Sequence, residues 1–94
     1  MQSFNGIVGS SGTTVTFTID SNYIDVINVD GGAPIWFTVN DGMPTLTGSP
    51  AYGSNNSYCA ATAGSTVRLN DTGNSGATIK MIATTNTMFS VIAV

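Results

Sequence analysis

Threonine and apolar side chains alternate over residues 14–19 within the segment 13–20, and this pattern restricts the fold more than any other feature of the sequence. Val15, Phe17 and Ile19 fall on one side of an extended chain, and the threonines between them fall on the other. A period of two is that of a β-strand, whereas an α-helix repeats every ~3.6 residues. The segment therefore predicts a strand with one buried and one solvent-facing side.

Similar segments recur about every ten residues and are separated by Gly, Asn, Asp or Pro. β-branched and aromatic residues dominate the apolar set, and strong helix formers are scarce, so no helix is expected. About eight short strands at this spacing predict an all-β chain, a single antiparallel β-sandwich of the jelly-roll type. The expected strands cover residues 4–8, 13–20, 23–29, 34–39, 57–61, 65–69, 77–83 and 88–94.

The chain divides into two expected parts. Residues 1–12 predict an N-terminal arm or an edge strand that ends in a Gly/Ser hinge, and residues 13–94 predict the sandwich domain. Residues 23–29 carry apolar side chains on both sides, which is typical of a strand that is covered on both faces. Asp30, Gly31 and Gly32 predict a tight hairpin turn, because such turns need positive φ and glycine adopts it without strain.

Charged side chains are scarce: Lys and Arg number 2, Asp and Glu number 5, and His is absent, which gives a net charge of −3. Without histidine, the usual general base and the Ser-His-Asp arrangement are missing, so we predict no catalytic residue and no cofactor, and the chain is not expected to be an enzyme. Two basic side chains cannot neutralise a nucleic-acid backbone or bind an anionic membrane, so neither is an expected partner.

Metal and thiol chemistry are also disfavoured. Residues 70–74 place oxygen ligands in a short segment, but a single carboxylate and the missing EF-hand spacing favour an ordinary turn over a calcium site. Cys59 has no second cysteine to pair with and no basic neighbour in the sequence to activate it. We therefore predict no metal site, and we interpret Cys59 as a small apolar residue of a strand.

Four apolar residues are the candidates for contact with a partner. Phe4, Ile7 and Val8 precede the glycine-rich hinge and form the candidate docking segment. Trp36 neighbours Phe37 on a strand, so the two rings point to opposite sides and Phe37 is the expected core residue. For Trp36 the sequence leaves three roles open: internal packing, a subunit interface, or a platform for a sugar ring.

The order of strands and turns resembles that of small all-β virion proteins of tailed bacteriophages. The resemblance extends over nearly the whole chain after Gly12, and its most distinctive part is Asp41-Gly42 followed by Pro44-Thr45. The segments that carry it are 23–29, 35–45, Gly53, Asn56 to Tyr58, Ala63-Gly64, 79–82 and 89–91.

This resemblance implies a capsid decoration, or cement, protein. Such a protein is non-enzymatic, binds the outside of the assembled head through the major capsid protein, and often acts as a homo-oligomer. The implied location is the virion, after assembly in the host cytoplasm. Two alternatives stay open: a structural component of the tail or neck, and a carbohydrate-binding module displayed on the virion.

Overall fold

A computed structural model of the chain describes residues 1–30, 33–40, 42–44, 58–60, 64–70 and 76–94. Within these ranges the structure contains β-strands and no helix, so the prediction of an all-β chain is confirmed. It follows that no described segment is a helix of the length and apolarity needed to cross a membrane. The strands are β1 (Gln2–Val8), β2 (Thr13–Thr16), β3 (Tyr23–Asn28), β4 (Ile35–Val39), β5 (Tyr58–Ala60), β6 (Ser65–Asn70), β7 (Thr78–Ile82) and β8 (Thr87–Ala93).

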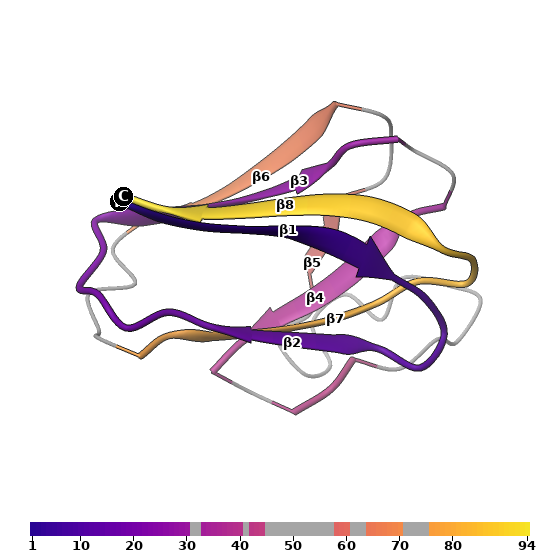
Figure 1. Ribbon diagram of the computed structural model, residues 1–94, viewed down its shortest axis with the longest axis horizontal. Coiled ribbons are helices and arrows are strands. Elements are labelled where there is room, and N and C mark those ends of the chain that lie inside the picture. Colours follow the sequence, from indigo (N-terminus) through magenta and orange to yellow (C-terminus); the bar gives the residue numbers. More distant parts are fainter. Residues whose placement is uncertain (31–32, 41, 45–57, 61–63, 71–75) are drawn as a thin grey trace.

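The strands form two antiparallel sheets that face each other as two layers (Figure 1). Sheet A has the order β1-β8-β3-β6, and sheet B has the order β2-β7-β4-β5. The two sheets meet at the edge strands β1 and β2, where the amide N–H of Thr18, just after β2, donates to the side-chain Oε1 of Gln2 at 2.9 Å. The segment 9–12 joins these two edges, and residues 2–8 form the edge strand of sheet A.

Strand pairing follows a nested pattern along the chain. β1 pairs with β8, β2 with β7, β3 with β6 and β4 with β5, so that the two numbers in each pair add to nine. Two further pairings, β3 with β8 and β4 with β7, join these pairs into the two sheets. Every connection except that from β4 to β5 crosses from one sheet to the other. Strands that are consecutive in the sequence therefore rarely pair with each other.

The hairpin predicted at Asp30 is therefore wrong, because β3 and β4 belong to different sheets. Hydrogen bonds of Asn28 and Asp30 stabilise the chain at the point where it leaves sheet A. The buried Asn28 side chain donates to the carbonyl of Ala33 at 2.8 Å, and the Asp30 carboxylate accepts from the amide of Met88 at 3.3 Å. Glycine permits a change of direction, but it does not specify whether the next strand pairs with the previous one or leaves for the other sheet.

The alternating segment 13–20 behaves as its pattern predicts, although β2 itself ends at Thr16. Val15 and Phe17 are buried and Ile19 packs against the core, while the intervening threonines are exposed. The Phe17 ring lies 5.3 Å from the ring of Phe4, which comes from the other sheet. This contact closes the core at the side of the sandwich where β1 and β2 are the edge strands of their sheets.

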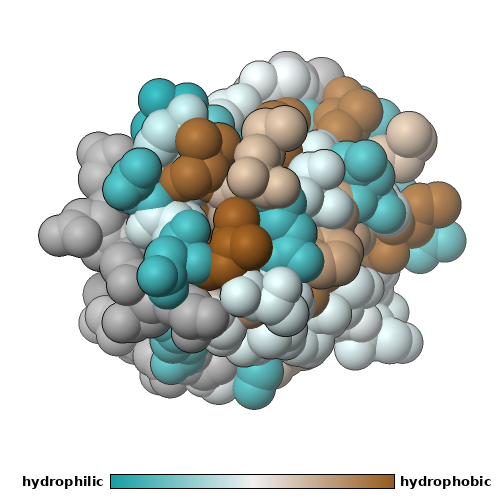
Figure 2. All heavy atoms as spheres, turned by 60° about the vertical axis from the view of Figure 1, so that its left-hand side comes forward, coloured by the Kyte–Doolittle hydropathy of each residue, from teal (hydrophilic) through white to brown (hydrophobic). Residues whose placement is uncertain are grey.

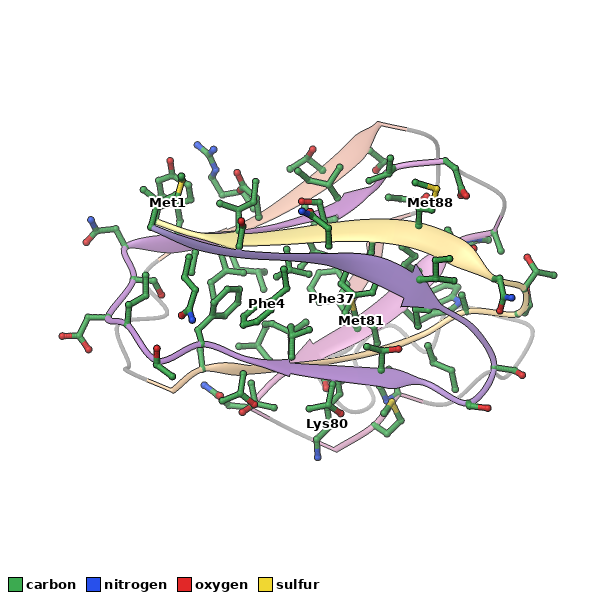
Figure 3. All side chains as sticks on the ribbon, viewed as in Figure 1. Met1, Phe4, Phe37, Lys80, Met81 and Met88 are labelled. Atoms are coloured by element: carbon green, nitrogen blue, oxygen red, sulfur yellow. The ribbon has the colours of Figure 1, made fainter. Side chains whose placement is uncertain are left out.

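A single core lies between the sheets (Figure 3). Phe4, Phe37 and Met81 point into the space between the layers, whereas Lys80 and Met88 point away from it. The prediction that Phe37 is a core residue is confirmed, since its side chain is fully buried. Both sheets contribute fully buried side chains, the largest of which are Phe17, Phe37, Ile24, Ile35, Ile79, Met81, Val8, Val26 and Val91.

Two local contacts join neighbouring strands, a pair of hydrogen bonds at the end of β4 and a close approach of an aromatic ring to β1. Asn40 follows β4 with φ of 54°, and in this conformation its amide donates to the carbonyl of Thr78 while its side-chain oxygen accepts from the amide of Thr78. Gly6 lies opposite Phe89, and a Cβ at Gly6 would stand 3.2 Å from that ring. The aromatic ring thus occupies the space that a side chain at position 6 would need.

Replacing Phe17 by alanine is expected to lower the free energy of unfolding by about 3–5 kcal/mol, because the substitution leaves a cavity in the core and removes the contact with Phe4. Denaturant unfolding followed by circular dichroism measures this change. Thr14→Ala, on the exposed side of the same segment, is the control and should stay within about 0.5 kcal/mol of the unmodified chain. Equal effects of the two substitutions would contradict the placement of Phe17 in the core.

Candidate functional site

Charged groups in the described part of the chain do not gather into a site for catalysis or metal binding. No group of three or more His, Cys, Asp or Glu residues that could hold a metal ion occurs there. Asp20 and Asp30 are exposed, and Lys80 points away from sheet B (Figure 3). The predicted turn at 71–74, Asp41 and the side chain of Cys59 lie outside the described residues.

Asp25 and Arg68 form a bidentate ion pair on the outer face of sheet A. They lie directly opposite each other on β3 and β6. The Nε and Nη2 atoms of Arg68 donate to the two carboxylate oxygens of Asp25 at 2.8 and 2.9 Å, and the guanidinium carbon lies 3.9 Å from the centre of the Tyr23 ring. The hydrogen bonds that Arg68 donates to the Asp25 carboxylate raise the pKa of the guanidinium above its ordinary value, so it stays charged at neutral pH.

This pair has a structural role. Asp25 is 9% exposed, and a carboxylate in such a position needs donors to replace the water it has lost. Arg68 supplies two donors in the fork geometry that suits a carboxylate. Both carboxylate oxygens are thereby engaged, and the arrangement joins the inner strand β3 to the edge strand β6.

A second feature of the same face is apolar. Ile7 of β1 lies opposite Met88 of β8, and Val29 follows β3 with its amide donating to the carbonyl of Met88 at 2.9 Å. These three side chains form one row across the sheet, and their exposed fractions are 61%, 47% and 44%. Large apolar side chains exposed side by side are a common mark of an interaction surface.

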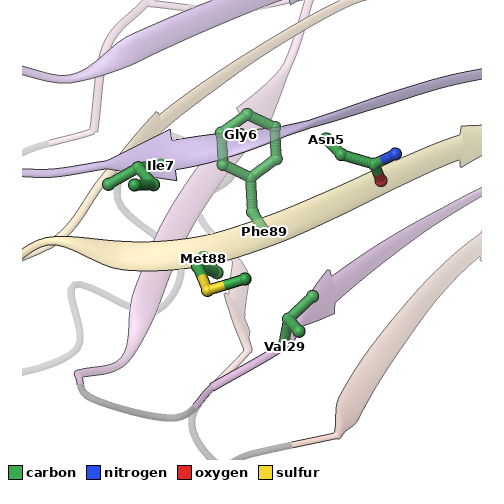
Figure 4. A pocket seen from close by; sticks show the side chains of 6 residues that line it. All are labelled: Asn5, Gly6, Ile7, Val29, Met88 and Phe89. Carbon is green, nitrogen blue, oxygen red and sulfur yellow. The ribbon is translucent and has the colours of Figure 1, made fainter.

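The row borders a hollow of about 390 Å³, hereafter the apolar hollow (Figure 4). Asn5 contributes the polar side chain of its lining, and the ring of Phe89 stands over Gly6. A surface of this composition can accept an apolar side chain of a partner and can offer it one amide group for a hydrogen bond. The lining residues are Asn5, Gly6, Ile7, Val29, Met88 and Phe89.

The structure separates the four residues that the sequence singled out. Val8 is fully buried, and Phe4 packs on Phe17 inside the core. Ile7 points outward and lines the apolar hollow. Trp36 is half-buried on the opposite face of β4 from Ile35 and Phe37, and its strand neighbours are Cys59 and Ile82. Ile7 and Trp36 therefore lie on different sheets, and their contact with a partner stays a prediction.

Val29 and Met88 were not among the candidates from the sequence. Both side chains point outward from apolar segments, and the alternation of residues in the sequence indicates this direction. Their proximity to Ile7 depends on the pairing of β8 with β1 and β3, which joins the two ends of the chain. No local signal in the sequence specifies that pairing.

Charged groups near these features include the Asp25–Arg68 pair and the exposed Asp30 carboxylate, which accepts from the amide of Met88. In Figure 2, brown apolar side chains lie among white ones of intermediate hydropathy and teal hydrophilic ones. Comparisons of the chain with protein-family models, with curated proteins and with solved structures give no match.

Replacing Arg68 by glutamine is expected to lower the midpoint of thermal unfolding, because the nearly buried Asp25 carboxylate loses its charged partner. Lys80→Gln is the matched control: it also changes the net charge from −3 to −4, and no ion pair involves Lys80 within the described residues. Differential scanning calorimetry at neutral pH measures both variants. Equal midpoints would show that the ion pair contributes nothing beyond its net charge.

Proposed function

We propose that the fold is a single antiparallel β-sandwich with jelly-roll topology. The nested pairing of β1 with β8, β2 with β7, β3 with β6 and β4 with β5 supports this assignment, because a long antiparallel hairpin wrapped around a core gives this order. The core shared by both sheets supports it as well. Jelly rolls occur in viral capsid and lectin domains, so the topology is compatible with a virion protein without specifying one.

For the function, we propose a non-enzymatic structural protein of a bacteriophage virion, a decoration protein that binds the outer shell of the head and stabilises it. The resemblance in sequence order points to this class of protein. The observation that carries the proposal is the apolar hollow on the outer face of sheet A, bordered by Ile7, Val29 and Met88. In the virion, the partner that would cover this hollow is the major capsid protein.

The physical basis of such docking is the burial of uncharged surface. Covering a Val, Ile or Met side chain fully is worth about 1.5–3 kcal/mol, and none of the residues that line the hollow brings a charge that must lose its water. Asn5 at the border supplies a polar group that can fix orientation. Attachment through this face therefore depends on shape and apolar contact and has little dependence on ionic strength.

Replacing Met88 by lysine should abolish or strongly weaken binding to heads that lack the protein, because a charge then enters the apolar hollow. Co-sedimentation of the purified chain with such heads measures binding. Thr14→Lys is the control, since it adds the same charge on the exposed side of β2 in the other sheet. Bound unmodified chain should also resist moderate salt, which screens charged contacts. Equal binding by the two variants, or release by salt, would contradict docking through the hollow.

Copy number separates the head from the tail or neck. A decoration protein occurs in many copies that increase with the number of capsid subunits, whereas a tail or neck component occurs in a small fixed number per particle. Quantitative gel analysis of purified virions therefore decides between the two locations. A single ring of copies at the tail or neck would replace the head assignment and leave the structural role in place.

The carbohydrate-binding alternative depends on Trp36, which is half-buried on the outer face of sheet B. If this ring were a platform for a sugar, a glycan array should show binding that Trp36→Ala removes, because stacking on the ring would be lost. We expect no binding by either chain. Specific binding that disappears in the variant would favour the sugar-binding module over the decoration protein.

A further inference from the structure

The free backbone edge of β1 offers a second interaction surface, which adjoins the apolar hollow because Asn5, Gly6 and Ile7 also line that hollow. β1 is an edge strand of sheet A, and its pairing with β8 runs in unbroken register from Gln2 to Val8. The strand contains no charged residue, no proline and no bulge. Charged residues, prolines and bulges commonly prevent an edge strand from pairing with another chain, and β1 has none of these features.

The register specifies which backbone groups of β1 are directed to this edge. The Met88 carbonyl accepts a hydrogen bond from the amide of Val29, so the backbone groups of Met88 are directed to β3 and away from β1. In an antiparallel ladder the direction alternates from residue to residue. Ile7, which lies opposite Met88, and the alternate residues Asn5 and Ser3 therefore direct their backbone N–H and C=O groups to the free side of β1.

Local contacts occur at the two ends of this edge, where at one end the Gln2 side chain accepts from the amide of Thr18. The hydroxyl of Thr13 lies 3.5 Å from the carbonyl of Ile7, at the end of the strand where the chain turns into β2. Ser3 and Asn5 are exposed, and the middle of the edge is therefore accessible to another strand.

We propose that a second copy of this chain pairs with β1, antiparallel and in the register that places Asn5 opposite Asn5 of the other copy. In this register Ser3 lies opposite Ile7 of the other copy and Ile7 opposite its Ser3. All three edge residues of each strand then exchange hydrogen bonds, and none is left over at either end. The two sheets A become one continuous sheet across a two-fold axis, which closes the assembly at a dimer.

The charge pattern favours a second copy over a different partner. A two-fold axis brings each residue near its own counterpart, so any charge close to the axis would face a like charge. β1 brings none. The only charged side chain of the other edge strand of sheet A is that of Arg68, which already binds Asp25.

The side chains that this register brings together also fit. On the inner side, the half-buried Phe4 would lie opposite Gly6 of the other copy, a position without a side chain. On the outer side, the amides of the two Asn5 residues would lie next to each other and can exchange a hydrogen bond. The register therefore places no two large side chains and no two charges directly opposite each other at the axis.

Disulfide trapping tests the register. Paired residues that exchange hydrogen bonds have Cα atoms about 5.5 Å apart, within the range of a disulfide, whereas the two Ser3 residues would be separated by more than about 10 Å. Asn5→Cys should therefore form a covalent dimer on oxidation, and Ser3→Cys should not. The unmodified chain, which contains Cys59, is the blank. Equal cross-linking of both variants, or of neither, would overturn the proposed register.

Sedimentation equilibrium of the purified chain tests the dimer itself. The unmodified chain should be a dimer, and Asn5→Lys, which places two like charges at the axis, should raise the dissociation constant at least tenfold. Ser90→Lys is the control: Ser90 is the β8 partner of Asn5 on the same outer face, and the two copies of this position would be about 14 Å apart. A monomeric unmodified chain, an equal effect of both variants, or open-ended polymers would overturn the proposal.

This dimer does not depend on the proposed function. Sedimentation and trapping use the isolated chain, whereas docking is measured on heads with Met88→Lys. A monomer that still binds heads would refute the dimer alone, and a dimer that does not bind heads would refute the docking surface alone.

Discussion

The core shared by the two sheets is the constraint on which the rest of the structure depends. Each sheet buries one side, and neither buries it without the other, so the nested strand pairs are held together by the side chains between them. The contact of Phe4 with Phe17 closes this core at the edge where β1 and β2 lie. Because Phe4 and Val8 serve the core, β1 is part of the folded unit, and its contribution to any interface comes from its outward side chains and its free backbone edge.

The outer face of sheet A combines two kinds of surface for physical reasons. At the strand pair β3–β6, a nearly buried carboxylate is balanced by a guanidinium that also lies against an aromatic ring. Around the hollow, the lining residues carry no charge, the nearby Asp30 carboxylate accepts from the Met88 amide, and three apolar side chains stay in contact with solvent. The first arrangement joins two strands of the sheet, and the second is the surface that we propose a partner covers. The proposed decoration role and the proposed dimer meet on β1, because Asn5, Gly6 and Ile7 line the hollow and also belong to the strand whose backbone edge would pair with a second copy.

Residue chemistry limits the function more sharply than the fold does. A chain without histidine, with two basic and five acidic residues, has few groups that can transfer protons or hold cations, and one of its carboxylates is occupied by Arg68. Recognition by shape, apolar contact and backbone hydrogen bonds does not need such groups. Both proposals rely on these interactions, which lose little strength when salt is added.

The sequence by itself determined the all-β class, the buried side of segment 13–20, and the burial of Phe17 and Phe37, because the alternation of a strand is visible in neighbouring residues. It did not separate Ile7 from Phe4 and Val8, which were predicted together as a docking segment, whereas the structure places Val8 in the core and Phe4 against it. It did not determine the partners of the strands: the glycines after Asp30 suggested a hairpin, and the structure has a crossing between sheets. Tertiary structure alone decided that the two ends of the chain pair and that Ile7, Met88 and Val29 meet. The physical reason is that strand pairing is chosen by the burial of the whole core, to which residues far apart in the sequence contribute together.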